Sequence, residues 1–222
     1  MAELESQNAE TIDIREAHRF DVGQLEDFCR AEVDGFSGNL DVRQFSGGQS
    51  NPTFMLSAGS KRYVMRKKPP GTLLASAHQV DREYRVMKAL ADTDVPVPTM
   101  RALCTDPEII GTEFYIMDFL DGRVLRDPQL PGFSAEERRA IYDQMNDVLA
   151  RLHKVDYKAI GLEDYGRPGN YYERQIGRWI KQYRAAETET VEPMEDLISY
   201  LPAHIPADDA TSIAHGDYRL EN

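Results

Sequence analysis

The hydrophobic pattern of this chain changes once, close to Asp121-Gly122, from short strand-like segments to longer helical stripes. The segments before this point are bounded by Gly, Pro and Asn turns, as β-strands usually are. After it, apolar residues recur at helical spacing, and Ser134 with Glu137 forms the S-x-x-E capping box that begins a helix. A chain whose strands precede its helices favours an α+β protein with two lobes.

Three parts are expected from this pattern. Residues 1–20 are predicted to be a loosely held tail, residues 21–117 a strand-rich lobe, and residues 118–222 a hinge followed by a mostly helical lobe. Asp21 can cap a first helix with an apolar stripe. Besides this helix and the one that Ser134 begins, we expect strands at 42–45, 53–56, 62–66, 99–104 and 113–117, and helices at roughly 78–91, 171–184 and 195–201.

The charge balance and the lack of long apolar runs exclude several classes of protein. A net charge of -12 argues against a general nucleic-acid binder, which usually has a basic stripe. No apolar run approaches the ~20 residues that cross a bilayer, and the polar, acidic start is neither a secretory signal nor a transit peptide. Cys29 and Cys104 lie far apart, outside any C-x-x-C pair, which favours reduced thiols. We therefore expect a cytoplasmic protein that binds neither nucleic acid nor membrane. The oligomeric state is left open.

The last eight residues contain the pattern H-x-D-x-x-x-x-N, with His215, Asp217 and Asn222 at its defined positions. This is the spacing of a phosphotransferase catalytic loop. In that loop the Asp accepts the proton of an attacking hydroxyl, and the Asn holds a magnesium ion on the nucleotide phosphates. The motif therefore indicates a kinase, with Asp217 as the catalytic base and Asn222 as a metal ligand.

Phosphoryl transfer needs a cover for the phosphates, and one segment between two expected strands is suited to this. Small residues let backbone N–H groups approach an anion, and this segment has them at Gly47, Gly48, Ser50 and Asn51. The match to G-x-G-x-x-G is poor, and an ordinary hairpin loop would look the same. The segment is therefore a hypothesis for phosphate binding.

A cation and a partner acid form the next candidate pair. Arg66 ends an apolar strand at the position where protein kinases have Lys in V-A-I-K, although Lys67 and Lys68 follow directly. Glu83 lies within an apolar helical stripe, and a carboxylate in such a place needs a cationic partner. We predict that Arg66 is this partner. The alternatives are a solvated basic strand end and an acid at the stripe edge that reaches water.

The segment 113–122 is a candidate hinge for the nucleotide base. It is an apolar strand that ends in a short turn, and backbone groups at such a crossing can pair with adenine. A buried strand of any other function would have the same sequence. Asp118 and Leu120 stand where the strand ends.

The order of these segments resembles one known family. FSGGQSN, YVMRKKPPG, VDREYRV, YIMDFLDG, RLHKVD and IAHGDYRLEN look like the aminoglycoside phosphotransferase family, over about 45–222. The resemblance implies a protein-kinase-like fold with a five-stranded antiparallel N-lobe sheet, one helix in that lobe, a hinge and a mostly helical C-lobe. It implies ATP or GTP as donor, Mg2+, and a hydroxyl of a small molecule as acceptor. The implied roles are Asp217 as base, His215 as a brace for the loop, Asn222 as a magnesium ligand, Arg66 with Glu83 as the phosphate-positioning pair, and Asp118 with Leu120 as hinge residues.

More narrowly, YVMRKKPPG and YGRPGNYYERQIGRWIKQY resemble the kinase-like regions of acyl-CoA dehydrogenase fusion proteins and their free-standing bacterial relatives. This branch implies a hydroxyacyl-CoA-like acceptor in preference to an aminoglycoside. A cationic ridge of Arg174, Arg178 and Lys181 agrees with it, although a solvated helix face would look the same. The acidic residues between Glu187 and Asp196 could instead serve an amine-rich acceptor.

The sequence departs from the family pattern in two places. Arg66 replaces the usual Lys, so Lys67 or Lys68 could be the phosphate contact. The family also has a second magnesium-binding Asp downstream of Asn222, so we expect a truncated form of a longer kinase with an incomplete C-lobe. A non-catalytic nucleotide-binding module, or pseudokinase, is the alternative. A hydrolase is a distant third, since no Ser or Cys elbow motif is present.

Overall fold

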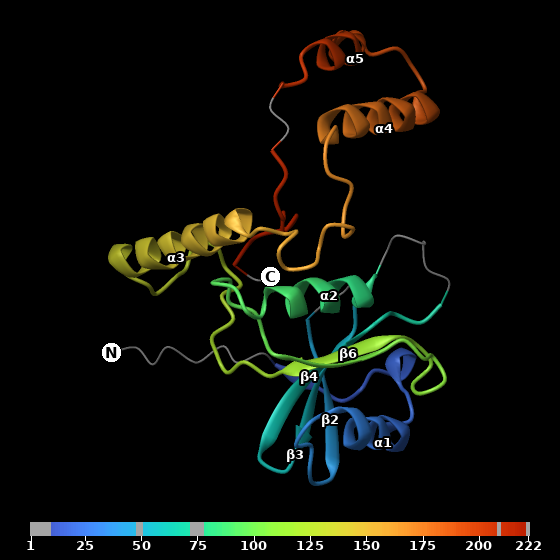
Figure 1. The fold of residues 1–222 in the computed structure, drawn as a ribbon, viewed down its shortest axis with the longest axis vertical. Helices are drawn as coiled ribbons and strands as arrows, with labels where there is room; N and C mark the ends of the chain where they lie inside the picture. The colour runs from blue at the N-terminus through green and yellow to red at the C-terminus, as the bar shows by residue number, and fades with distance from the viewer. Residues whose placement is uncertain (1–9, 48–50, 72–77, 208–209, 221–222) are drawn as a thin grey trace. The chain divides into compact units, whose positions relative to one another are not determined.

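The computed structural model describes residues 10–47, 51–71, 78–207 and 210–220. The chain divides by its internal contacts into two compact units (Figure 1). Unit 1 comprises Met1–Lys154 and Ala214–Asn222, and unit 2 comprises Val155–Ile213. The segment with the H-x-D motif therefore belongs to the same unit as the strand-rich lobe. The lobe boundary between residues 117 and 118 stays a prediction.

Unit 1 is built on an antiparallel sheet of six strands in the order β1-β2-β3-β4-β6-β5. All five strands expected from the sequence are present, each within two residues of its expected bounds. The strands are β1 Thr11–Ile12, β2 Leu40–Phe45, β3 Thr53–Ala58, β4 Lys61–Lys67, β5 Met100–Cys104 and β6 Phe114–Asp118.

The sixth strand corrects the expected five-stranded sheet, and it lies within the segment 1–20 that was expected to be a loosely held tail. β1 pairs with β2 in the register Thr11 with Phe45 and Ile12 with Gln44. The Ser46 N–H also donates to the Glu10 carbonyl oxygen at 2.9 Å. Two residues are too few to show the alternation of a strand in the sequence. β1 can therefore be recognised only from its pairing with β2.

Helix α1, Val22–Glu32, packs against one face of the sheet. Asp21 caps it as predicted, since its carboxylate accepts a hydrogen bond from the Gln24 N–H at 3.1 Å. Leu25 and Cys29 of this helix are buried in the core, and burying a Leu contributes roughly 2 kcal/mol. Both cysteines are free thiols in this core. The core also holds Phe54, Leu56, Tyr63, Met65, Ala102, Cys104, Ile110, Phe114 and Ile116.

Helix α2, Val80–Leu90, contacts β5 and β6 on the opposite face (Figure 1). Side chains alternate along β4, so Tyr63 and Met65 point into the α1 core while Arg66 points to α2. The helix begins two residues later than the sequence predicted. His78 has a left-handed backbone with φ of 58°, which does not continue into a helix.

The helices that follow agree with the sequence signals. Helix α3 is Ala135–Lys154, and its capping box is formed as predicted: the Ser134 N–H donates to Glu137 Oε2 at 2.8 Å, and the Glu137 N–H to Ser134 Oγ at 3.2 Å. Unit 2 contains α4, Tyr171–Ala186, and α5, Glu192–Ala203. Arg184 joins these two helices through Glu195, with Nη2 2.6 Å from Oε2. No helix in the described ranges is long and apolar enough to cross a membrane.

Candidate functional site

An ion pair between Arg66 of β4 and Glu83 of α2 is at the centre of the candidate site. Arg66 Nε lies 3.0 Å from Glu83 Oε2, and each side chain is 34% exposed. Arg66 has Thr53 and Tyr115 as its cross-strand partners, which places it mid-sheet beneath the helix. The pairing predicted from the sequence is confirmed, and about a third of the Arg66 side chain remains exposed to solvent.

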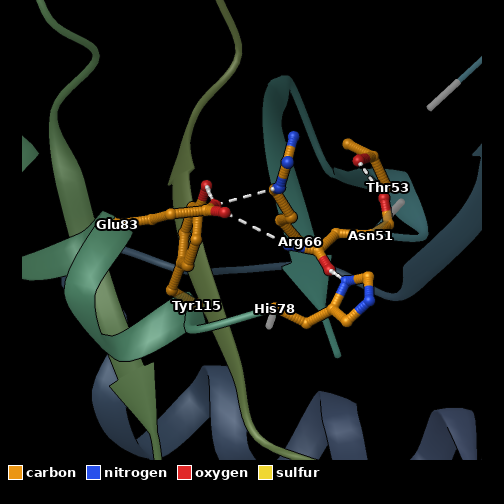
Figure 2. A network of polar contacts seen from close by, with 6 residues as sticks. All are labelled: Asn51, Thr53, Arg66, His78, Glu83 and Tyr115. Carbon is orange, nitrogen blue, oxygen red and sulfur yellow. Dashed lines mark hydrogen bonds and ion pairs between the residues drawn. The ribbon is translucent and has the colours of Figure 1, made fainter. Parts of the chain in front are cut away.

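The Glu83 carboxylate accepts hydrogen bonds from strand β6 and from the segment that precedes β3 (Figure 2). The Tyr115 hydroxyl of β6 donates to Oε2 at 3.0 Å, and the Asn51 amide, just before β3, donates to Oε1 at 3.1 Å. Burial, followed by the charge of Glu83, raises the pKa of Tyr115 well above its usual range, so the phenol stays a donor. Two hydrogen bonds hold this carboxylate in one orientation, and its ion pair with Arg66, a charge contact in which Nε makes no hydrogen bond, places the guanidinium beside it.

The structure distinguishes Arg66 from the two lysines that follow it. Lys67 points to the α1 face, where it is 2% exposed and its Nζ lies 5.4 Å from the centre of the Phe20 ring. Burial lowers the pKa of Lys67. Lys68 Nζ pairs with Glu113 Oε2 at 2.8 Å. Arg66 is therefore the cation of the three that meets Glu83.

The glycine-containing segment is described only at its ends. Gly47 is exposed, and nothing lies within 4 Å of where a Cβ would stand. Gly48 and Ser50 lie outside the described residues. Asn51 is 3% exposed, and its carboxamide bridges Glu83 and His78. Phosphate binding by this segment stays a prediction, and the Asn51 side chain is engaged within the protein.

At the predicted hinge, the side chain and the backbone of Asp118 are both engaged. Its carboxylate accepts two hydrogen bonds from Arg101, at 2.7 and 2.6 Å, and these hold the pKa of Asp118 below its usual value. Its N–H donates to the Thr99 carbonyl oxygen at 2.9 Å. Leu120 follows the end of β6 and is 66% exposed. Purine contacts at this hinge stay a prediction.

The H-x-D segment contacts α3 through a hydrogen bond. The Tyr218 hydroxyl donates to the Met145 carbonyl oxygen at 2.9 Å, and the His215 ring packs edge-on against Tyr218 at 5.4 Å between centroids. The Asp217 side chain is 67% exposed, with Oδ1 3.5 Å from Arg219 Nε. Its carboxylate is accessible from solution, as the predicted role of a catalytic base would need; that role stays a prediction.

The predicted magnesium site is described only in part. Asn222 lies outside the described residues. Within the described ranges, His, Cys, Asp and Glu side chains form no group of three or more that would hold a metal ion. Magnesium binding at Asn222 therefore stays a prediction.

Two residues of the site were missed by sequence reasoning. Tyr115 stands in an apolar strand that looks like any buried strand, and its one signal is that a buried Tyr hydroxyl requires a partner. His78 was assigned to the start of a helix, and nothing in its sequence neighbourhood marks its contact with Asn51.

A comparison with protein-family models gives one match, to the phosphotransferase enzyme family, over residues 41–222. This match covers most of the chain. The chain belongs to the phosphotransferase enzyme family.

Solved and curated relatives of this phosphotransferase-family chain agree with the assignment. A crystal structure from Ralstonia eutropha JMP134, described as a candidate aminoglycoside phosphotransferase, is 57% identical with a TM-score of 0.81, covering 92% of this chain and 60% of that one. The kinase-like α+β fold implied by the resemblance is thereby confirmed for the part that the chain spans.

Among curated proteins, the similarity is to parts of longer chains. The Arabidopsis thaliana protein named "Probable acyl-CoA dehydrogenase IBR3" is 51% identical over 225 residues, which are 94% of this chain and 27% of that protein. Acyl-CoA dehydrogenase family member 10 of Mus musculus is 50% identical over 186 residues, 84% of this chain and 17% of that protein. The chain thus spans about a quarter or less of these relatives, and the predicted resemblance to their branch is confirmed.

Proposed function

We propose that this chain carries the nucleotide-binding part of an ATP- or GTP-dependent phosphotransferase. It would move the γ-phosphoryl group to a hydroxyl of a small molecule. The observation that carries the proposal is the Arg66–Glu83 ion pair, at 3.0 Å, in the same compact unit as the H-x-D segment. Phosphoryl transfer depends mainly on positioning and on neutralising charge, and a cation held by a half-buried acid serves both needs.

In this proposal the strand-rich lobe binds the nucleotide. Arg66 contacts the phosphates with the part of its guanidinium that Glu83 does not use. Backbone N–H groups of Gly47, Gly48 and Ser50 cover the phosphates. Because the Asp118 N–H is already bonded to Thr99, the purine would meet the Asp118 carbonyl oxygen and the backbone of Leu120.

Asp217 is the proposed catalytic base. It accepts the proton of the acceptor hydroxyl while the hydroxyl oxygen bonds to the γ-phosphorus and the bond to the β-phosphate oxygen breaks, releasing the nucleoside diphosphate. His215 braces the loop through its ring contact with Tyr218. Asn222 would hold magnesium, which neutralises phosphate charge when bound.

A hydroxyacyl-CoA-like acceptor is favoured over an aminoglycoside. The curated relatives are named as acyl-CoA dehydrogenases, and Arg178 and Lys181 are exposed on α4. Arg184 pairs with Glu187 and Glu195, at 3.0 and 2.6 Å, so its single positive charge offsets part of the negative charge of these two carboxylates within unit 2. Less negative charge therefore remains for a polycationic acceptor.

The test is a transfer assay with radiolabelled MgATP and two acceptor classes, a hydroxyacyl-CoA and an aminoglycoside. It is run on this chain and on the longest natural protein that contains it. We expect label on the hydroxyacyl-CoA, and a rate lowered on the order of 10²–10⁴-fold by Asp217→Asn. Transfer retained by Asp217→Asn would overturn the assignment of the base. Nucleotide binding without transfer to any acceptor would make the chain a non-catalytic nucleotide-binding module.

A further inference from the structure

His78 has an unusual backbone at the point where the chain enters α2. Its φ of 58° lies in the left-handed region, which costs a residue with a Cβ on the order of 1 kcal/mol. Such a conformation persists only where surrounding contacts hold it. The side-chain contact at this position is with Asn51, whose Oδ1 lies 2.6 Å from His78 Nδ1 (Figure 2).

The hydrogen bonds around Asn51 determine which nitrogen of His78 carries a proton. Glu83, ionised beside Arg66, can only accept, so the Asn51 amide must turn its NH2 group to Glu83. The Asn51 carbonyl oxygen then faces His78 and needs a donor. His78 Nδ1 therefore carries a hydrogen, and the chain of contacts runs His78, Asn51, Glu83, Arg66.

This chain of contacts joins two segments that the sheet does not hold together. Asn51 follows the glycine-containing segment, and His78 precedes α2, which carries Glu83. Asn51 is 3% exposed, so if it lost its hydrogen bond to His78 or Glu83, water could not replace that bond. Fixing the start of α2 against Asn51 sets where Glu83 stands relative to β4.

We propose that His78 is a positioning residue of the nucleotide site: by donating from Nδ1 to Asn51 it orients Glu83 and thereby Arg66 toward the phosphates. This rests on the proposed function for its effect on nucleotide, while the contact itself is independent of that function. His78 does not touch the nucleotide in this proposal.

Two substitutions separate the side-chain contact from the backbone strain. His78→Gly keeps the left-handed backbone at no steric cost and removes the donor. His78→Asn also tolerates this backbone, and its amide nitrogen can replace Nδ1 as the donor. Thermal unfolding of each variant establishes that it is folded before binding is measured.

Calorimetry with MgATP on the folded chain is the first measurement. We expect His78→Gly to weaken binding about tenfold and His78→Asn to stay within about twofold of the wild type. Equal binding by the wild type and His78→Gly would overturn the proposal. Loss in both variants alike would also overturn it, since the donor would not then be what matters.

Nitrogen-15 NMR of the histidine rings is the second measurement and needs no nucleotide. His78 should show a protonated Nδ1, which reverts to the more common tautomer in Asn51→Leu. His18 is the internal control: Gln44 Oε1 accepts from the Arg15 N–H at 3.0 Å, so its amide donates to His18 Nδ1 at 2.9 Å and the proton is on Nε2. A His78 tautomer like that of His18 would overturn the contact. A wild type that has the contact but binds no nucleotide would instead reject the proposed function.

Discussion

The Tyr115 hydroxyl of β6 donates to Glu83 Oε2 of α2 at 3.0 Å, and the same oxygen lies 3.0 Å from Arg66 Nε of β4. One carboxylate oxygen thus ties two neighbouring strands to the helix that covers them. Because the Tyr115 hydroxyl and the Arg66 cation both contact this one atom, the position of α2 over the sheet and the position of the cation are determined together.

Tyr115→Phe should lower the free energy of unfolding by about 1 kcal/mol, because one hydrogen bond to a charged acceptor is lost while Arg66 and Asn51 remain. Urea unfolding followed by circular dichroism measures it. Tyr63→Phe is the matched control. Among the described residues the buried Tyr63 hydroxyl has no hydrogen-bond partner, so its removal should be neutral or stabilising. Equal costs for the two variants would contradict a specific role for the Tyr115 bond.

Arg66→Met should weaken MgATP binding at least about tenfold, because it removes the cation proposed to contact the phosphates. Lys68→Met is the matched control, since Lys68 directly follows β4 and is two residues from Arg66. Lys68 is paired with Glu113 at 2.8 Å, so its loss should change binding less than about twofold. Calorimetry gives both affinities. The reverse order of effects would identify Lys68 as the phosphate contact.

Arg101→Met should reduce stability near neutral pH and have no effect in acid. Arg101 holds the pKa of Asp118 in the folded protein below its ordinary value of 3.8. The ion pair of Arg101 with Asp118 therefore contributes fully to the free energy of unfolding above about pH 4. This contribution is lost as the pH falls through the lowered pKa of Asp118. We expect a difference on the order of 1 kcal/mol at pH 7, measured by urea unfolding across a pH series. A difference that persists unchanged in acid would show that packing, and not the charge of Asp118, carries it.

Lys67→Met should stabilise the protein at pH 7 by on the order of 1 kcal/mol, because a buried ammonium group loses its hydration. Burial lowers the pKa of Lys67 below its ordinary value of 10.5. The unfolded chain then binds more protons between the two values, so wild-type stability rises with pH in that alkaline window. The increase in stability from Lys67→Met should therefore become smaller as the pH rises through this alkaline window. Thermal unfolding at several pH values measures it. A loss of stability at pH 7 would mean that the contact with the Phe20 ring outweighs the burial.

Much of the fold could be predicted because its signals are local. The cap at Asp21 and the box of Ser134 with Glu137 each join residues three apart, and the structure has both sets of hydrogen bonds. The five longer strands show their own alternation. The Arg66–Glu83 pair was also predictable, since an acid inside an apolar helical stripe requires a cation and a strand ending in bases precedes it.

The two-residue strand β1 was not predictable, because its evidence is the register with β2 and not a period of its own. The choice among Arg66, Lys67 and Lys68 likewise depended on which face of β4 each side chain takes. Only the packed sheet shows that Lys67 points to Phe20 and that Lys68 pairs with Glu113.

The sequence by itself determined the class of the fold, the family and the identity of the ion pair, because periodicity, caps and motif spacing act within single segments. The tertiary structure decided what surrounds that pair. Tyr115 and Asn51 are each 32 residues from Glu83, and His78 is 27 from Asn51. No local pattern relates side chains at such separations, and a hydrogen bond between them exists only once strands and helix have packed at the right distance.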